Sequence, residues 1–249
     1  MIGVYDSGVG GLAVLREIRR LLPAADIVYL ADQANVPYGE RPLPEIRILA
    51  LAAVRRLVDL GADTVVVACN TATAAALAEL RQAFPAVEIV GMEPAVKPAA
   101  ATTRNGRIAV LATEATFAAA RFEDLVGRYA ADAEVIAHPC PGWAAAVEED
   151  WPEAAGDRVA EHLAPLIASG VDTVVLACTH YSFLARPIAD AMGPSVTVVD
   201  PVDAVARHAA RIAPAPGSGR TTYLTTGDPE RLAGQVLRLL GLEVTAGRA

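Results

Sequence analysis

The sequence lacks the features that mark nucleic-acid-binding, membrane and secreted proteins. No basic cluster is longer than the pairs Arg19-Arg20 and Arg55-Arg56, and the formal net charge is -8, so we expect no nucleic-acid partner. No apolar run approaches the roughly 20 residues that span a bilayer, so we expect no membrane contact. No basic segment followed by an apolar stretch opens the chain, so we expect no signal peptide and a cytoplasmic location.

Cysteine and histidine are scarce, with three cysteines and four histidines in 249 residues. An odd number of cysteines in a protein expected in the cytoplasm argues against a disulfide framework. No Cys/His set has a metal-ligand spacing such as C-x₂-C, so we expect no metal site. The glycine-rich segment Asp6–Gly11 lacks the lysine and the spacing of a phosphate-binding loop, and it does not fit G-x-G-x-x-G.

Short apolar runs alternate instead with stretches of helical periodicity. The runs are continuous in Val, Ile and Leu, which is typical of strands buried on both faces of a parallel sheet. The helical stretches, such as 43–60, 154–169 and 229–240, carry charged outer positions. This alternation predicts an α/β fold with right-handed crossovers. The expected strands are Ile2–Tyr5, Ile27–Leu30, Thr64–Ala68, Glu88–Gly91, Arg107–Ala112, Ala133–Ala137, Thr173–Ala177, Val196–Val199 and Thr222–Thr225.

The two halves of the chain resemble each other. The segment TVVVACNTA at 64–72 matches TVVLACTHY at 173–181, and a Gly-x-Asp turn precedes each. An acid followed by proline ends the fourth strand of each half. We predict two similar α/β domains, residues 1–95 plus 208–249 with Cys69 and residues 96–207 with Cys178. A loop at 214–219 would lead the last strand and helix back to the first domain.

Cys69 and Cys178 occupy equivalent positions at the carboxyl ends of their strands. Ligands bind beyond this end of open parallel sheets, so two facing halves would present one thiol to each side of a bound molecule. Racemisation needs that arrangement, because a proton leaves Cα on one side and another arrives on the opposite side. A thiol with an unperturbed pKa of about 8.5 reaches either protonation state near neutral pH. A buried cysteine often only packs, but two at equivalent positions, each followed by polar residues, indicate a catalytic pair.

Polar residues surround both thiols in the sequence. Asn70 and Thr71 follow Cys69, and Thr179 and His180 follow Cys178, where side chains and N–H groups at helix starts can hold a carboxylate. His180 can also position or supply a proton.

Two further loops follow the first strand of each half. Asp6 and Ser7 precede the glycines of the first loop, and Asp6 is placed to act on Cys69 as an accessory base. Thr113 and Thr116 occupy the corresponding loop of the second half and are candidates for binding the ligand. The Pro37-Tyr38-Gly39 segment, taken alone, is interpreted as a turn.

Together these segments resemble the bacterial glutamate racemases. The resemblance runs in order through DSGVGGL at 6–12, VPYG at 36–39, ACNTA at 68–72, Glu93-Pro94, ACTHY at 177–181 and Thr226-Gly227-Asp228. The related aspartate and hydantoin racemases share the paired cysteines, but typically neither this glycine loop nor the histidine after the second Cys-Thr.

The resemblance implies two doubly wound parallel-sheet domains related by a pseudo-twofold axis, with the active site in the cleft between them. It implies no pyridoxal phosphate, other cofactor or metal. The product would be D-glutamate for peptidoglycan, and the partners would be glutamate and a second copy of the chain in a homodimer. Cys69 and Cys178 would exchange protons with Cα, and Glu148 matches the family's acid near the second thiol. The residues that would bind glutamate or assist the thiols are Asp6, Ser7, Tyr38, Gly39, Asn70, Thr71, Thr179 and His180.

Some residues depart from the family pattern and leave alternatives open. Ser182-Phe183 replaces the usual proline and leucine after CTHY, and 142–147 reads GWAAAV, with Trp143 in place of a Val-Pro-Leu type run. We expect these changes to border the cleft. The alternatives are a racemase of aspartate or another small acidic amino acid, a ligand-binding relative without catalysis, and a thiol redox protein. The spacing of the cysteines is unlike a C-x-x-C redox motif.

Overall fold

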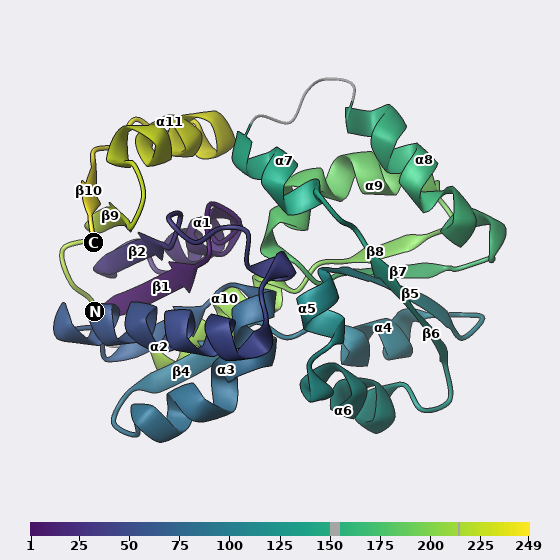
Figure 1. Cartoon of the computed structure of the whole chain (residues 1–249), viewed down its shortest axis with the longest axis horizontal. Helices are drawn as coiled ribbons and strands as arrows, with labels where there is room; N and C mark the ends of the chain where they lie inside the picture. Colours follow the sequence, from purple (N-terminus) through teal and green to yellow (C-terminus); the bar gives the residue numbers. More distant parts are fainter. Residues whose placement is uncertain (150–154, 214) are drawn as a thin grey trace.

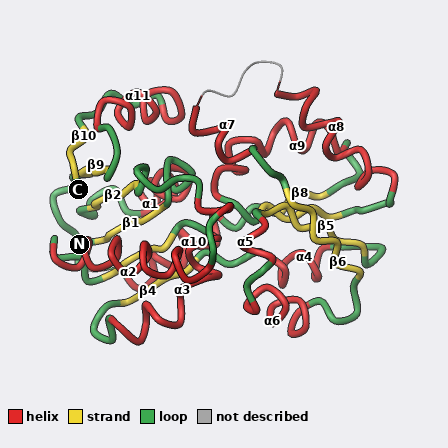
Figure 2. Tube along the Cα trace, viewed as in Figure 1, coloured by secondary structure: helices red, strands yellow, loops and turns green. Residues whose placement is uncertain are grey.

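The structure is a computed structural model that describes residues 1–149, 155–213 and 215–249. Its strands form two separate sheets, and helices cover both faces of each (Figure 1). Figure 2 shows the strands as two yellow layers between red helices. The predicted α/β fold is confirmed.

The first sheet has the strand order β10-β9-β2-β1-β3-β4. All of its neighbouring strands are parallel. Since β9 pairs with β2, the predicted return of the last segment to the first half is confirmed. The strands are β1 Ile2–Asp6, β2 Ile27–Ala31, β3 Thr64–Val67, β4 Glu88–Gly91, β9 Thr221–Thr225 and β10 Ala246–Arg248.

The second sheet has the order β6-β5-β7-β8 and is also parallel throughout. This order repeats the β2-β1-β3-β4 order of the first sheet, so the two units share one topology. The resemblance between the halves of the sequence is therefore present in the fold. The strands are β5 Arg107–Ala112, β6 Glu134–Pro139, β7 Thr173–Leu176 and β8 Thr197–Val199.

Helices connect successive strands, as parallel pairing requires. The helix predicted at 229–240 is confirmed, and the helices predicted at 43–60 and 154–169 match α2 and α8. Ala154, the first residue of the predicted helix, and Pro214, the first residue of the predicted loop, lie outside the described residues. Two 3₁₀ helices, η1 Tyr38–Glu40 and η2 Thr179–Leu184, follow β2 and β7. The α-helices are α1 Leu12–Leu21, α2 Leu43–Asp59, α3 Asn70–Ala83, α4 Val96–Thr102, α5 Glu114–Phe117, α6 Ala120–Tyr129, α7 Trp143–Glu149, α8 Ala155–Ala168, α9 Ala185–Met192, α10 Val202–Ile212 and α11 Pro229–Leu240.

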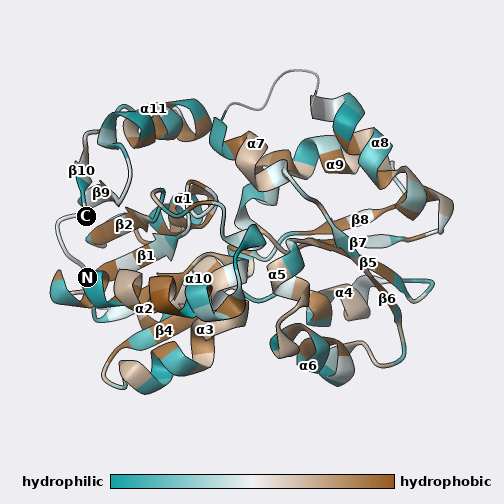
Figure 3. Ribbon diagram, in the orientation of Figure 1, coloured by the Kyte–Doolittle hydropathy of each residue, from teal (hydrophilic) through white to brown (hydrophobic). Residues whose placement is uncertain are grey.

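The core is continuous between the two sheets. One apolar cluster joins β1 and α1 to β7 and α9, with Leu12, Ile18, Leu176 and Ile188 fully buried. Two further clusters fill the opposite faces of the sheets, beneath α2 and α3 and beneath α4 and α6. Figure 3 shows hydrophobic strands inside and hydrophilic positions along the outer helices. Burial of this apolar surface is the main stabilising contribution to the fold.

The division at residues 95 and 207 stays a prediction. Helix α10 crosses the second of these boundaries and packs on α1. None of the helices in the described ranges has the length and apolar character that crossing a bilayer needs.

Candidate active site

A cavity of about 230 Å³ lies beyond the carboxyl ends of the central strands of both sheets. The Cys69 end of β3 and the Cys178 end of β7 both open onto it, so the two thiols share one cavity. Its lining is Ser7, Val36, Pro37, Tyr38, Gly39, Glu40, Cys69, Asn70, Thr71, Thr113, Glu114, Cys140, Pro141, Gly142, Ala144, Ala145, Cys178, Thr179, His180 and Tyr181.

Cys69 is the N-cap residue of α3. The backbone N–H of Ala72 donates to its sulfur at 3.4 Å, and the Ser7 hydroxyl lies 3.6 Å from the same atom. Burial and the charge of Asp6 nevertheless raise the pKa of Cys69 to about 12. The thiol is therefore protonated at neutral pH, and the helix N-terminus stabilises the charge that forms when it loses the proton.

Cys178 lies beside a histidine that is held by a carboxylate. The Cys178 sulfur is 3.7 Å from Nδ1 of His180, and Nε2 of the same ring is 2.7 Å from Oε1 of Glu148. Burial alone would lower the pKa of His180, but its hydrogen bonds to Cys178 and Glu148 outweigh burial and raise it. The imidazole is therefore held in its protonated form, with one N–H directed at each partner.

Glu148 joins this histidine to the glycine-rich loop after β1. Its Oε1 accepts the backbone N–H of Val9 at 2.6 Å, while Gln33 and Gln235 each donate to Oε2 at 3.3 Å. Burial alone would raise the pKa of Glu148, but these bonds and the bond to His180 lower it. A buried carboxylate with this many donors stays ionised.

The loop glycines allow this close approach. A Cβ on Gly8 would overlap the Glu148 carboxylate, and a Cβ on Gly10 would overlap the Thr179 hydroxyl and lie 2.7 Å from Nδ1 of His180. The first loop thus packs its bare backbone against the second half of the chain. This contact explains why glycine occupies both positions.

Asp6 also reaches across to the second half. Its carboxylate accepts the Thr179 hydroxyl at 2.9 Å and the Gly8 N–H at 2.8 Å. Burial raises the pKa of Asp6 in spite of the attraction of His180 and these bonds. The side chain within hydrogen-bond distance of the Cys69 thiol is Ser7, whereas Asp6 influences that thiol through its charge.

A group of three threonines makes a second bridge between the halves. Thr71 at the start of α3 lies 3.0 Å from the Thr113 hydroxyl and 3.4 Å from that of Thr116. Thr113 lines the cavity, whereas Thr116 is fully buried behind it. Thr116 therefore supports the two hydroxyls that face the cavity.

Two other side chains of the first half are held in fixed orientations. The Tyr38 hydroxyl accepts from Tyr5 at 2.8 Å and donates to Asp32 at 2.5 Å. The Asn70 amide donates to the Met92 carbonyl at 3.0 Å, and among the described residues its buried Oδ1 has no hydrogen-bond partner. Because Asn70 lines the cavity, this oxygen is a free acceptor for a bound molecule.

The structure brings the residues singled out from the sequence into one place. Asp6, Thr116 and Glu148 lie behind the cavity wall, and the others line it. Sequence reasoning missed Asp32, which accepts from Tyr38 within the loop after β2, and it missed Gln33 and Gln235, whose contacts with Glu148 join distant parts of the chain. It also left Glu40, Glu114 and Tyr181 unassigned in the cavity wall.

The departures from the family pattern border the cavity only in part. Gly142, Ala144 and Ala145 line it, as expected. Trp143 and Ser182-Phe183 are not among the lining residues, so that expectation was wrong for them. Trp143 instead packs its ring against Tyr181 and His162. Because the Trp143 ring is turned into the core, the small residues Ala144 and Ala145 of α7 face the cavity.

Two like α/β units that present paired thiols to one cavity define a class of protein built to act on both faces of a small molecule. The chain belongs to the Asp/Glu/Hydantoin racemase family, whose model matches residues 2–209. A glutamate racemase of Roseiflexus sp. (strain RS-1) is 47% identical over 96% of this chain and 91% of its own. Another, of Ectopseudomonas mendocina (strain ymp), is 46% identical over 96% of this chain and 94% of its own. The resemblance inferred from the motifs is confirmed.

Solved structures agree with this assignment. Glutamate racemase of Bacillus anthracis has a TM-score of 0.89 at 30% identity, covering 100% of this chain and 97% of that one. Escherichia coli glutamate racemase, in complex with L-glutamate and the activator UDP-MurNAc-ala, has a TM-score of 0.88 at 30% identity, covering 99% and 96%. Picrophilus torridus aspartate racemase, at 18% identity and a TM-score of 0.54 over 83% of this chain and 91% of that one, shares the fold alone.

Proposed function

We propose that the protein interconverts L- and D-glutamate by proton transfer between Cα and two thiols. The observation that carries the proposal is that Cys69 and Cys178 line one cavity from equivalent strand ends of two like units. One thiolate removes the Cα proton from one face of the substrate, and the other thiol delivers its own proton to the opposite face of the planar intermediate, which inverts the configuration. The glutamate racemase relatives support the substrate.

The order of proton transfer follows from the surroundings of the two thiols. The protonated His180 stabilises negative charge on the Cys178 sulfur, so Cys178 accepts the Cα proton first. Cys69, whose pKa is raised to about 12, holds the proton that is delivered to the opposite face. After one turnover the Cys178 sulfur carries a proton and the Cys69 sulfur carries the charge. The reverse reaction begins from that state.

Neutral donors would hold the substrate. Among the described residues, no lysine or arginine lines the cavity, so the glutamate carboxylates are bound by backbone N–H groups at the starts of α3 and η2 and by hydroxyls such as those of Thr71, Thr113 and Thr179. The free Oδ1 of Asn70 accepts a hydrogen bond from the substrate ammonium group. Asp6 and Glu148 act from behind, through Thr179 and His180.

D-glutamate made here would supply peptidoglycan, in a cytoplasmic enzyme that works as a homodimer. Size-exclusion chromatography with light scattering tests the dimer, because a dimer has twice the 25.9 kDa mass of the chain.

The test of the proposal is the formation of D-glutamate from L-glutamate, followed by chiral chromatography with no cofactor added. We expect equilibration to equal amounts of the two enantiomers. L-aspartate at the same concentration, and the double variant Cys69→Ser/Cys178→Ser with L-glutamate, serve as controls and should not react appreciably. Failure with glutamate would overturn the proposal, and faster conversion of aspartate would assign the protein to the aspartate alternative.

A further inference from the structure

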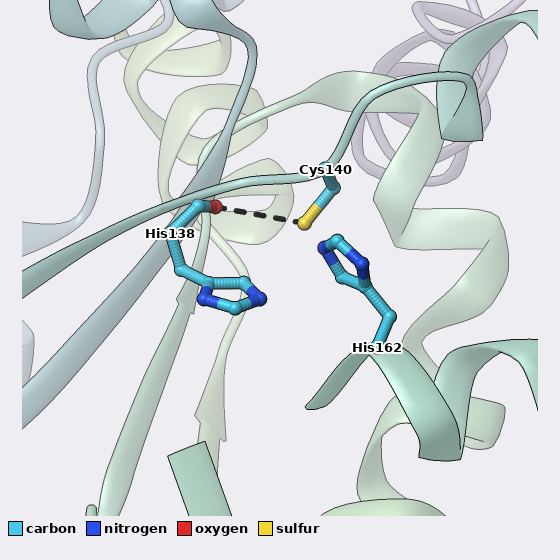
Figure 4. A group of neighbouring side chains, drawn as sticks. All are labelled: His138, Cys140 and His162. Atoms are coloured by element: carbon cyan, nitrogen blue, oxygen red, sulfur yellow. Dashed lines mark hydrogen bonds between the residues drawn. The ribbon is translucent and has the colours of Figure 1, made fainter. Parts of the chain in front are cut away.

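A cluster of metal-ligating side chains lies on the side of β6 that α8 covers. His138 lies near the end of β6, and Cys140 directly follows its last residue, with the Cys140 sulfur 3.6 Å from the His138 carbonyl oxygen. His162 projects from α8 toward them (Figure 4). One donor atom of each residue lies within 4.8 Å of the others. The sequence expectation of no metal site overlooked this set because the third residue comes from a distant helix.

The ring of His162 is held close to the end of β6. Its Nε2 lies 3.0 Å from the Pro139 carbonyl oxygen. Figure 4 shows this same nitrogen turned toward Cys140, so a bound metal would take the place of the contact with the Pro139 carbonyl.

His138 supplies an unsatisfied nitrogen. Its Nε2 is buried and has no hydrogen-bond partner among the residues that the structure describes. A buried ring nitrogen without a partner is rare unless a ligand or ion satisfies it.

We propose that His138, Cys140 and His162 form a binding site for Zn²⁺, with water as the fourth ligand. Two imidazoles and one thiolate are a donor set that Zn²⁺ prefers, and its donors lie about 3.3–3.6 Å apart in tetrahedral geometry. The three side chains reach this geometry if their donor atoms approach one another by up to about 1.5 Å. Zn²⁺ forms a bond to the Cys140 sulfur and displaces the thiol proton to solvent.

The surroundings provide a route for the ion and a link to the catalytic cavity. A cavity of about 530 Å³, lined also by Arg158 and Glu161, opens onto His138 and His162. Cys140 belongs at the same time to the wall of the catalytic cavity, and its carbonyl accepts the Tyr181 hydroxyl at 3.1 Å. The ion would therefore sit in the wall that separates the catalytic cavity from the outer surface.

The experiment is a Zn²⁺ titration against a chromophoric chelator. It uses the Cys69→Ser/Cys178→Ser chain, so that the thiols of the catalytic cavity cannot bind the metal. We expect one ion per chain, and a loss of affinity of more than about 100-fold on adding His162→Gln or Cys140→Ser, since the loss of an outer-shell contact alone costs 10–100-fold. His208→Gln, which changes an exposed histidine on α10, is the matched control and should leave the affinity unchanged.

Two further readouts separate coordination from misfolding. Co²⁺ should give a thiolate charge-transfer absorption that Cys140→Ser abolishes. Zn²⁺ should raise the Tm of the parent chain and leave the Tm of the His162→Gln chain unchanged. Equal affinity with and without His162 would overturn the proposal. The proposal would also be overturned if the wild-type chain bound Zn²⁺ and the Cys69→Ser/Cys178→Ser chain did not, because the metal would then lie in the catalytic cavity.

Discussion

Oε1 of Glu148 lies 2.7 Å from Nε2 of His180, and both side chains are buried. The pair joins the acidic residue at the end of α7 to the histidine beside the second thiol. Since the backbone N–H of Val9 in the first half donates to the same oxygen, this pair also links the two halves of the chain.

Glu148→Gln should lower the pKa of His180 while keeping the shape of the side chain. Because activity needs the protonated imidazole, kcat should fall by about 10- to 100-fold and the alkaline limb of the pH profile should move to lower pH. The measurement is kcat/KM against pH. Glu149→Gln, an exposed neighbour, is the control. A profile identical to that of the wild type would show that Glu148 does not act through His180.

Gly10→Ala should separate the two halves at the active site. The added Cβ collides with the Thr179 hydroxyl and the His180 ring, so we expect kcat/KM to fall by about 100-fold or more, as for misplaced catalytic groups. Gly127→Ala in α6, where an added Cβ meets nothing within 4 Å, should keep full activity and stabilise the helix by about 0.5–1 kcal/mol. Full activity in Gly10→Ala would mean that the loop does not need this contact.

Asp172→Asn should destabilise the second half. Burial would raise the pKa of Asp172, but the Thr103 hydroxyl and the backbone N–H of Arg104 outweigh burial and lower it to about 2. Since the folded pKa lies below the unfolded one, the stabilisation is complete above pH 4 and is lost as the pH falls toward 2. We expect a loss of about 2 kcal/mol at pH 7.

Urea unfolding at pH 7 and pH 3 checks this expectation. The difference between the wild type and Asp172→Asn should shrink at the lower pH. Asp190→Asn, at an exposed ion pair with Arg186, should change the free energy of unfolding by less than about 0.5 kcal/mol. A difference that is the same at both pH values would contradict the linkage.

Cys69→Ser and Cys178→Ser should each reduce kcat by at least about 1,000-fold, because a hydroxyl is a far weaker acid than a thiol and cannot take over proton transfer. The thermal unfolding of both variants should stay close to that of the wild type. Near-normal turnover in either variant would contradict a pair of thiols.

The strands could be predicted from the sequence because buried parallel strands are continuous apolar runs. Strand β10 could not, since Ala246–Arg248 contains no such run and is defined only by pairing with β9. The cavity residues of the motifs were also predictable, because they follow strand ends. The contacts of Asp32 and Gln235 were not, since they join segments far apart in the chain.

The most direct test of the two-thiol account is the reaction of L-glutamate in deuterated water, stopped at low conversion and analysed by mass spectrometry of the separated enantiomers. Two thiols on opposite faces predict deuterium at Cα of the newly formed D-glutamate and protium in the remaining L-glutamate. Equal deuterium in both enantiomers would show that a single base serves both faces and would contradict the account.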